Sequence, residues 1–119
     1  MASAYFRLPL NLPHAATVAV RVRHHGRPWS DDLTRQLVHL LDPYREREDN
    51  PPAEEAAQVV ERAASLARRI VAEIEAAKGG NDKLGQAVRN LFECLGLGEE
   101  GAAISLRAGE NPNSALRPR

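Results

Sequence analysis

The sequence predicts a helix-rich α+β fold, with three antiparallel helices arranged around one long central helix at about 51–78. Three observations predict it: apolar residues recur at steps of four and three through that long segment, shorter repeats of the same kind flank it, and the segment 16–23 alternates as a strand does. A chain of 119 residues has the size of one domain. We therefore expect a single domain over 1–108.

The segment 16–23 is predicted as a strand because apolar side chains alternate along it with polar and basic ones. Its apolar side would carry Val18, Val20 and Val22. A short edge strand at 4–8 would precede it, and a turn at 25–28 would follow it. These elements make up the small N-terminal strand or hairpin of the predicted fold.

The first helix is expected from Ser30 to about Asp42, because a serine before two aspartates is a typical helix start. Pro43 would stop this helix, and the charged segment 44–50 would be an exposed linker. Its core stripe would consist of Leu33, Leu37, Leu40 and Leu41.

The long helix is expected to begin after Asn50 as its N-cap and to end at Gly79 and Gly80. Its regular seam of apolar residues would consist of Ala56, Val60, Ala63, Ala67, Ile70, Ile74 and Ala77. A second ridge would carry Val59, Leu66 and Val71. Two arrangements satisfy this seam: the two shorter helices cover it within the chain, or a second copy covers it in a homodimer.

A third helix is expected over 82–95, with Gly96 after its last turn. The loop before it is so short that this helix should lie antiparallel to the long one. Its core positions would be Leu84, Val88, Leu91 and Leu95. A last short strand is predicted at 102–107, and the tail 109–119 has too little apolar content to pack, so we expect it to be disordered.

The composition limits the classes of function and the cellular compartments that the chain is expected to have. A formal net charge of zero removes a global electrostatic reason for binding nucleic acid. The single cysteine, Cys94, forms no disulfide within the chain, and no signal-peptide pattern or membrane-spanning apolar run is present. We expect a cytoplasmic protein, and its abundant arginine and alanine favour a bacterial source.

Catalytic and metal chemistry find little support in the sequence. The histidines at positions 14, 24, 25 and 39 are not spaced as zinc ligands are, and no glycine loop precedes a helix as a phosphate loop does. Cys94 falls in the apolar register of the third helix, so we expect a packed thiol rather than a nucleophile. No metal and no cofactor are therefore expected, and an enzyme using Cys94 or the histidines is the least favoured alternative.

Two groups of residues are predicted to bind other macromolecules. Arg21, Arg23, Arg27 and Trp29 form a basic cluster with an aromatic side chain, which suits a phosphate backbone and a stacked base. Arg62 and Arg69 lie one heptad apart on the outer face of the long helix.

We expect a non-enzymatic protein-interaction module, acting as a regulator, an adaptor or a small subunit of a bacterial complex. A protein partner is expected, and a homodimer through the long helix is the alternative to coverage of that helix within the chain. The alternative is a small nucleic-acid-binding subunit that uses the N-terminal arginines.

Overall fold

The computed structural model describes residues 9–77 and 82–103, and over these ranges the chain is helical. Four α-helices carry the fold: α2 (Leu12–His24), α3 (Asp31–Leu41), α4 (Ala53–Ala77) and α5 (Asp82–Cys94). Two 3₁₀ turns, η1 (Pro28–Ser30) and η2 (Asp42–Tyr44), stand before and after α3. A short helical segment at 98–103 follows α5.

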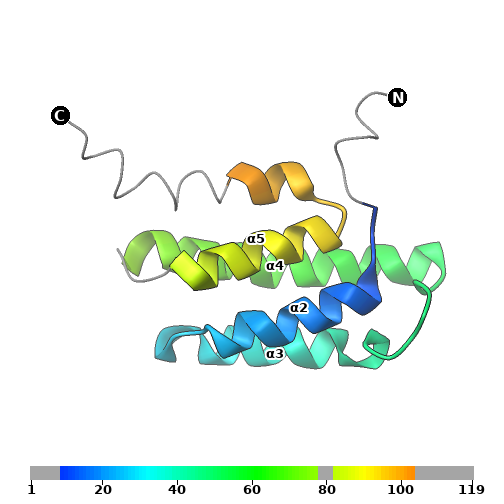
Figure 1. Ribbon diagram of the computed structural model, residues 1–119, viewed down its shortest axis with the longest axis horizontal. Coiled ribbons are helices and arrows are strands. Elements are labelled where there is room, and N and C mark those ends of the chain that lie inside the picture. The colour runs from blue at the N-terminus through cyan, green and yellow to red at the C-terminus, as the bar shows by residue number, and fades with distance from the viewer. Residues whose placement is uncertain (1–8, 78–81, 104–119) are drawn as a thin grey trace.

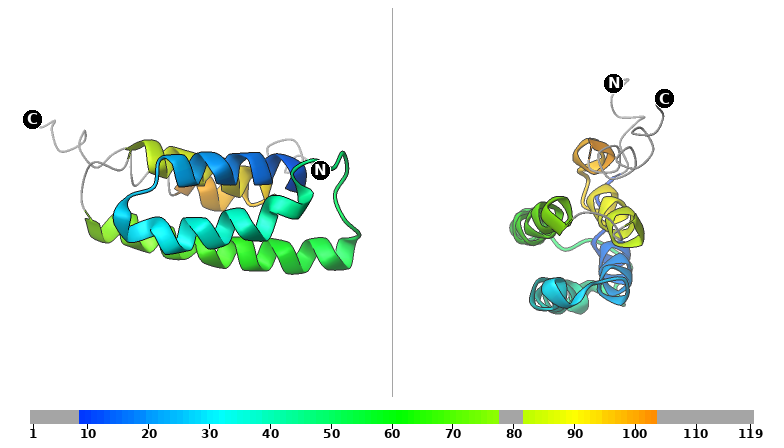
Figure 2. Two further views of the ribbon diagram at one scale, coloured as in Figure 1. Left: turned by 90° about the horizontal axis from the view of Figure 1, so that it is seen from below. Right: turned by 90° about the vertical axis from the view of Figure 1, so that its left-hand side faces the viewer.

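The four helices form an antiparallel bundle, in which each helix packs against two others (Figure 1). Helix α2 packs against α3 and α5, and α4 packs against the same two helices from the other side. Seen from one end, the four helices stand at the corners of a rough square (Figure 2). Consecutive helices run in opposite directions, which is the simplest connectivity for a four-helix bundle.

Helix α2 overturns the predicted strand at 16–23 and with it the α+β fold class. A strand would have buried Val20 beside Val18 and Val22, but the Val20 side chain is 43% exposed. The buried face of α2 follows helical spacing instead and includes the small residues between the valines: Leu12, Ala15, Ala16, Val18, Ala19 and Val22. Asn11 caps this helix, since its side chain accepts a hydrogen bond from the His14 backbone N–H at 3.0 Å.

The predicted C-terminal strand at 102–107 is also wrong where the structure describes it, because residues 102 and 103 belong to the helical segment 98–103. The remainder of that strand, the edge strand at 4–8 and the tail at 109–119 lie outside the described residues. Segment 98–103 packs on the bundle, where Arg68 of α4 donates two hydrogen bonds to the Glu100 carboxylate, at 2.7 and 3.0 Å. Gly96, at φ +80°, turns the chain between α5 and this segment.

The three predicted helices are confirmed, with two corrections to their ends. Ser30 does not cap α3 with its side chain; its hydroxyl accepts from the Arg27 backbone N–H and donates to the Arg27 carbonyl, both at 2.9 Å. Asn50 does not cap the long helix. It binds the start of α2, where it accepts from the Leu12 N–H at 2.7 Å and donates to the Leu10 carbonyl at 2.9 Å.

The predicted linker at 44–50 is exposed apart from Tyr44. The Tyr44 ring is buried in the core, and its hydroxyl donates to a Glu55 carboxylate oxygen at 2.5 Å. The Arg47 guanidinium stands over the same ring, 5.1 Å from its centre. Tyr44 therefore holds the connection between α3 and α4 against the bundle.

Most of the predicted seam of the long helix is buried within the chain: Ala56, Ala63, Ala67, Ile70 and Ile74 are buried and Val60 is half-buried, while the Ala77 side chain lies outside the described residues. Helices α3 and α5 both pack against α4, as the first of the two predicted arrangements requires. The buried residues of α4 are Ala56, Val59, Ala63, Ala64, Ala67, Ile70, Val71 and Ile74. A homodimer stays a prediction, but it would have to use another surface than this seam.

Candidate binding surfaces

The predicted N-terminal cluster lies at one end of the bundle, on the last turn of α2 and on η1 (Figure 1). Arg21 and Arg23 are exposed on α2, and Arg27 and Trp29 follow in the connection to α3. The Trp29 side chain is 37% exposed, which is unusual for a large aromatic residue in a small bundle. Local connectivity thus places these four residues at the same end of the bundle, although they do not line one common surface.

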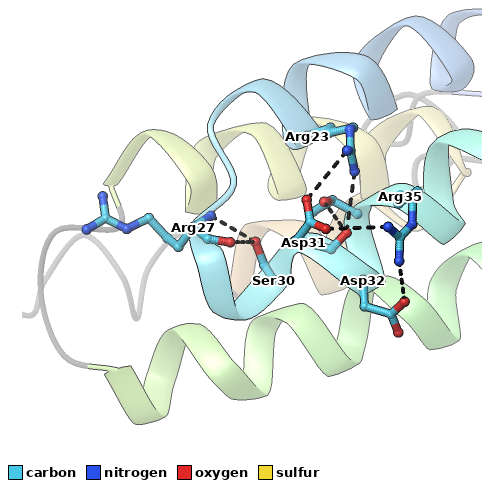
Figure 3. Close-up of polar contacts among 7 residues, drawn as sticks. Arg23, Arg27, Ser30, Asp31, Asp32 and Arg35 are labelled. Atoms are coloured by element: carbon cyan, nitrogen blue, oxygen red, sulfur yellow. Dashed lines mark hydrogen bonds and ion pairs between the residues drawn. The ribbon is translucent and has the colours of Figure 1, made fainter.

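Arg23 is already engaged by an acid. Its guanidinium lies 3.5 Å from the Asp31 carboxylate and also reaches the Asp31 carbonyl at 3.4 Å. Asp31 is shared with Arg35, which bridges to Asp32 at 2.9 Å (Figure 3). Figure 3 shows the Arg27 guanidinium extending away from this network. Arg27 is therefore more available to a ligand than Arg23.

Arg21 belongs to a different surface, a small notch between α2 and α5. The notch has a volume of about 180 Å³ and is lined by Arg21, His25, Lys83, Gln86, Ala87 and Asn90. Lys83 and the two amides come from α5, more than fifty positions after the arginine cluster in sequence. Sequence reasoning missed them, because only the antiparallel packing of α2 and α5 places them beside Arg21.

Arg62 and Arg69 are both exposed on α4, as predicted, but they lie on the opposite side of the bundle from the α2–α5 face. Arg62 lines a depression. This is an open groove of about 720 Å³ between α3 and α4, lined by Gln36, His39, Leu40, Gln58, Glu61, Arg62, Ser65 and Leu66. We refer to it as the α3–α4 groove.

Two leucines give the α3–α4 groove an apolar component. Leu40 and Leu66 are each half-buried, packed on the core from one side and open to the groove from the other. Both stand at the margin of their helix's apolar stripe, so the sequence placed them in the core or on a second ridge and did not indicate a groove. Their polar neighbours include both charge signs, with Glu61 and Arg62 adjacent on α4.

The residues considered for catalysis lie in or directly after α2, α3 and α5. Cys94 is buried at 8% exposure, and burial, reinforced by the nearby Glu93 carboxylate, raises the pKa of its thiol, while Arg21 opposes this rise. His24 and His25 contact each other edge to face, with ring centres 5.0 Å apart. Within 9–77 and 82–103, no three His, Cys, Asp or Glu side chains converge as metal ligands would. In the same ranges, no helix is both long and apolar enough to cross a bilayer.

Comparison with known protein families, with curated proteins and with solved structures finds no match to this chain. Function must therefore be argued from the two surfaces themselves. They differ in chemistry: the α3–α4 groove is large and partly apolar, whereas the α2–α5 notch is small and basic.

Proposed function

We propose that this chain is a protein-interaction module of a larger assembly, and that the α3–α4 groove receives the partner. The observation that carries the proposal is the groove itself, with a volume of about 720 Å³ and two half-buried leucines in its lining. Apolar side chains that stay partly open to solvent within a depression are typical of a surface that another polypeptide covers.

The shape and chemistry of the groove favour a helix as the docking element. A groove between two helices accepts an amphipathic helix, which anchors itself through apolar residues at spacings of three and four. Those anchors would contact Leu40 and Leu66, while Glu61 and Arg62 would pair with charges at the rim. Because Glu61 and Arg62 carry opposite charges, their pairing with the partner would fix the position of the docked helix along the groove and would add little affinity.

A tyrosine placed in the groove tests the proposal without disturbing the core. Ser65 lines the groove and is exposed, so Ser65→Tyr fills it while leaving Leu40 and Leu66 in place. Ala72→Tyr is the matched control, because Ala72 is exposed on the same helix outside the groove lining. Proteins retained from an extract of the source cells by the immobilised wild type would be purified and their affinities measured by calorimetry.

The expected result is a partner whose dissociation constant rises at least about tenfold with Ser65→Tyr, equivalent to about 1.4 kcal/mol, and stays unchanged with Ala72→Tyr. Circular dichroism of both variants checks that each remains helical. A partner that binds wild type and both variants with equal affinity would show that the groove is not the binding surface.

A further inference from the structure

We propose that the α2–α5 notch binds a backbone phosphate of a single-stranded nucleic acid, with Arg21 and Lys83 supplying the cationic groups and His25 supplying an imidazole N–H donor. This site is separate from the α3–α4 groove, because the notch lies between α2 and α5. The inference therefore goes beyond the proposed protein-binding function and does not depend on it.

The notch brings together hydrogen-bond donors from two ends of the sequence. Arg21 and His25 come from the last turn of α2 and the residue after it, and Lys83 stands in the first turn of α5. Gln86 and Asn90 follow Lys83 at steps of three and four, so all three side chains share one face of α5. The volume of about 180 Å³ suits one phosphate group rather than a larger ligand.

The lining contains cationic, amide and methyl groups but no carboxylate. Asp82 precedes Lys83 in the chain but does not line the notch. Among the interactions resolved for the described residues, the side chains of Arg21, Lys83, Gln86 and Asn90 form no hydrogen bond or ion pair with another side chain. Within the described residues these donors line one notch and are not paired with another side chain, which leaves them available to a phosphate oxygen.

The neighbouring depression, of about 280 Å³ between α2 and α3, is a weaker candidate. It is lined by Arg23, Gly26, Arg27, Pro28, Asp31 and Thr34, so a carboxylate stands among its cations. Arg23 there is already neutralised by Asp31 at 3.5 Å. A phosphate entering it would meet a negative charge, whereas in the notch it would not.

A nucleic-acid strand is favoured over an isolated phosphate because a further cation and an aromatic side chain lie at the same end of the bundle as the notch. Arg27 and Trp29 directly follow α2 at the same end of the bundle, and the indole of Trp29 is 37% exposed. A strand held at one phosphate in the notch would extend toward a second cation and a stacking surface, and stacking on an aromatic ring contributes about 1–3 kcal/mol per base. Single-stranded substrates expose bases for this contact, whereas a duplex does not.

Fluorescence anisotropy with a short, labelled single-stranded oligonucleotide tests the proposal over a series of salt concentrations. Arg21→Ala and Lys83→Ala each remove one cation from the notch, and Arg69→Ala removes the same charge from α4 as the matched control. All three side chains are exposed, so the variants should fold as wild type does.

We expect each notch variant to weaken binding about tenfold and to reduce the slope of log K against log salt by about 0.7, while the α4 control leaves both unchanged. Inorganic phosphate should compete with the oligonucleotide and shift the side-chain amide NMR signals of Gln86 and Asn90. Trp29→Ala should weaken binding without changing the salt slope, because stacking involves no counterion release.

Three results would overturn the proposal. The first is no oligonucleotide binding at low salt. The second is an equal loss in the notch and control variants, which would mean that total charge rather than the notch governs binding. The third is binding of a phosphoserine peptide at the notch without binding of the oligonucleotide, which would assign the notch to a different class of macromolecule.

Discussion

Cys94 is the one cysteine of the sequence and therefore one of the two candidates, with the histidines, for an enzymatic role. Its thiol is 8% exposed, and burial raises its pKa, so at neutral pH it is held as the unreactive thiol rather than the thiolate. We expect the native protein to react with a thiol-specific disulfide reagent far more slowly than the guanidinium-unfolded protein. The measurement is the absorbance of the released chromophore over time in both states.

The raised pKa of the Cys94 thiol also makes the stability of the fold depend on pH. Because the folded-state pKa is raised, the unfolded chain loses its thiol proton first, so ionisation favours unfolding as the pH rises past the ordinary thiol pKa. If the thiol of the native protein reacted as fast at neutral pH as the thiol of the unfolded protein, Cys94 would be an accessible thiolate, and this result would favour the enzymatic alternative.

Asn50 is expected to stabilise the fold more than an exposed loop residue normally does. Its amide satisfies the Leu12 N–H at 2.7 Å and the Leu10 carbonyl at 2.9 Å, across about forty positions of sequence. Asn50→Ala leaves both groups without this partner at the start of α2, which should cost about 1–2 kcal/mol in the free energy of unfolding. Urea titration followed by circular dichroism measures the change.

The neighbouring Asp49 provides the comparison, since it is exposed and Asp49→Ala should change the free energy of unfolding by less than about 0.5 kcal/mol. Equal effects of the two substitutions would contradict the role assigned to Asn50. The sequence identified Asn50 as a cap but assigned it to the helix that follows. When the backbone groups that an asparagine binds are remote in sequence, as the Leu12 N–H and the Leu10 carbonyl are here, the local sequence does not show which helix the asparagine caps.

At the level of elements, α2 shows why a short valine-rich segment is ambiguous. Val18, Val20 and Val22 satisfy the two-residue period of a strand, and the helical period becomes visible only when Ala15 and Ala19 are counted as core residues. In this bundle both alanines are fully buried, and such small side chains let neighbouring helices approach closely. The order and spacing of α3, α4 and α5 were predictable because their apolar repeats are longer and contain leucine and isoleucine, so the repeats mark the buried face of each helix.

The helical segment 98–103 depends on a glycine at its contact with α5. A Cβ atom at Gly101 would lie 2.9 Å from the Arg89 carbonyl oxygen and 3.0 Å from the Phe92 Cβ, and neither atom belongs to the flexible end of a side chain. Gly101→Ala should therefore push the segment off α5 and lower stability by about 1–3 kcal/mol. Thermal unfolding followed by circular dichroism measures this loss.

Gly98→Ala is the matched control within the same segment. A Cβ atom there would meet only the Glu93 side chain, at 3.9 Å, which is an ordinary contact. Since alanine favours helix over glycine, this variant should be unchanged or more stable by up to about 1 kcal/mol. If Gly101→Ala proved as stable as Gly98→Ala, the close packing of 98–103 on α5 would be wrong.

At the level of the whole molecule, the candidate surfaces were less predictable than the helices. Arg62 and Arg69 are exposed, as the local periodicity of the long helix predicts. Connectivity brings the N-terminal arginines to one end of the bundle, but Arg21 lines a different depression from Arg23 and Arg27. The sequence did not indicate that Lys83 would stand beside Arg21, or that Leu40 and Leu66 would share a groove. Those pairs depend on which helices become neighbours, and apolar repeats alone do not determine that choice.

The closure of the bundle within one chain predicts how the protein unfolds. The seam of α4 is covered by α3 and α5, and α2 closes the remaining side, so the core that stabilises the fold needs no second copy. The midpoint of thermal unfolding should therefore stay constant over about a hundredfold range of protein concentration, whereas an obligate dimer would gain stability with concentration by mass action. Differential scanning calorimetry across that range, with light scattering at each concentration, measures both quantities. A midpoint that rises with concentration together with a doubled mass would show that a second copy is part of the folded unit, and the outer face of α4 would then be the first surface to test.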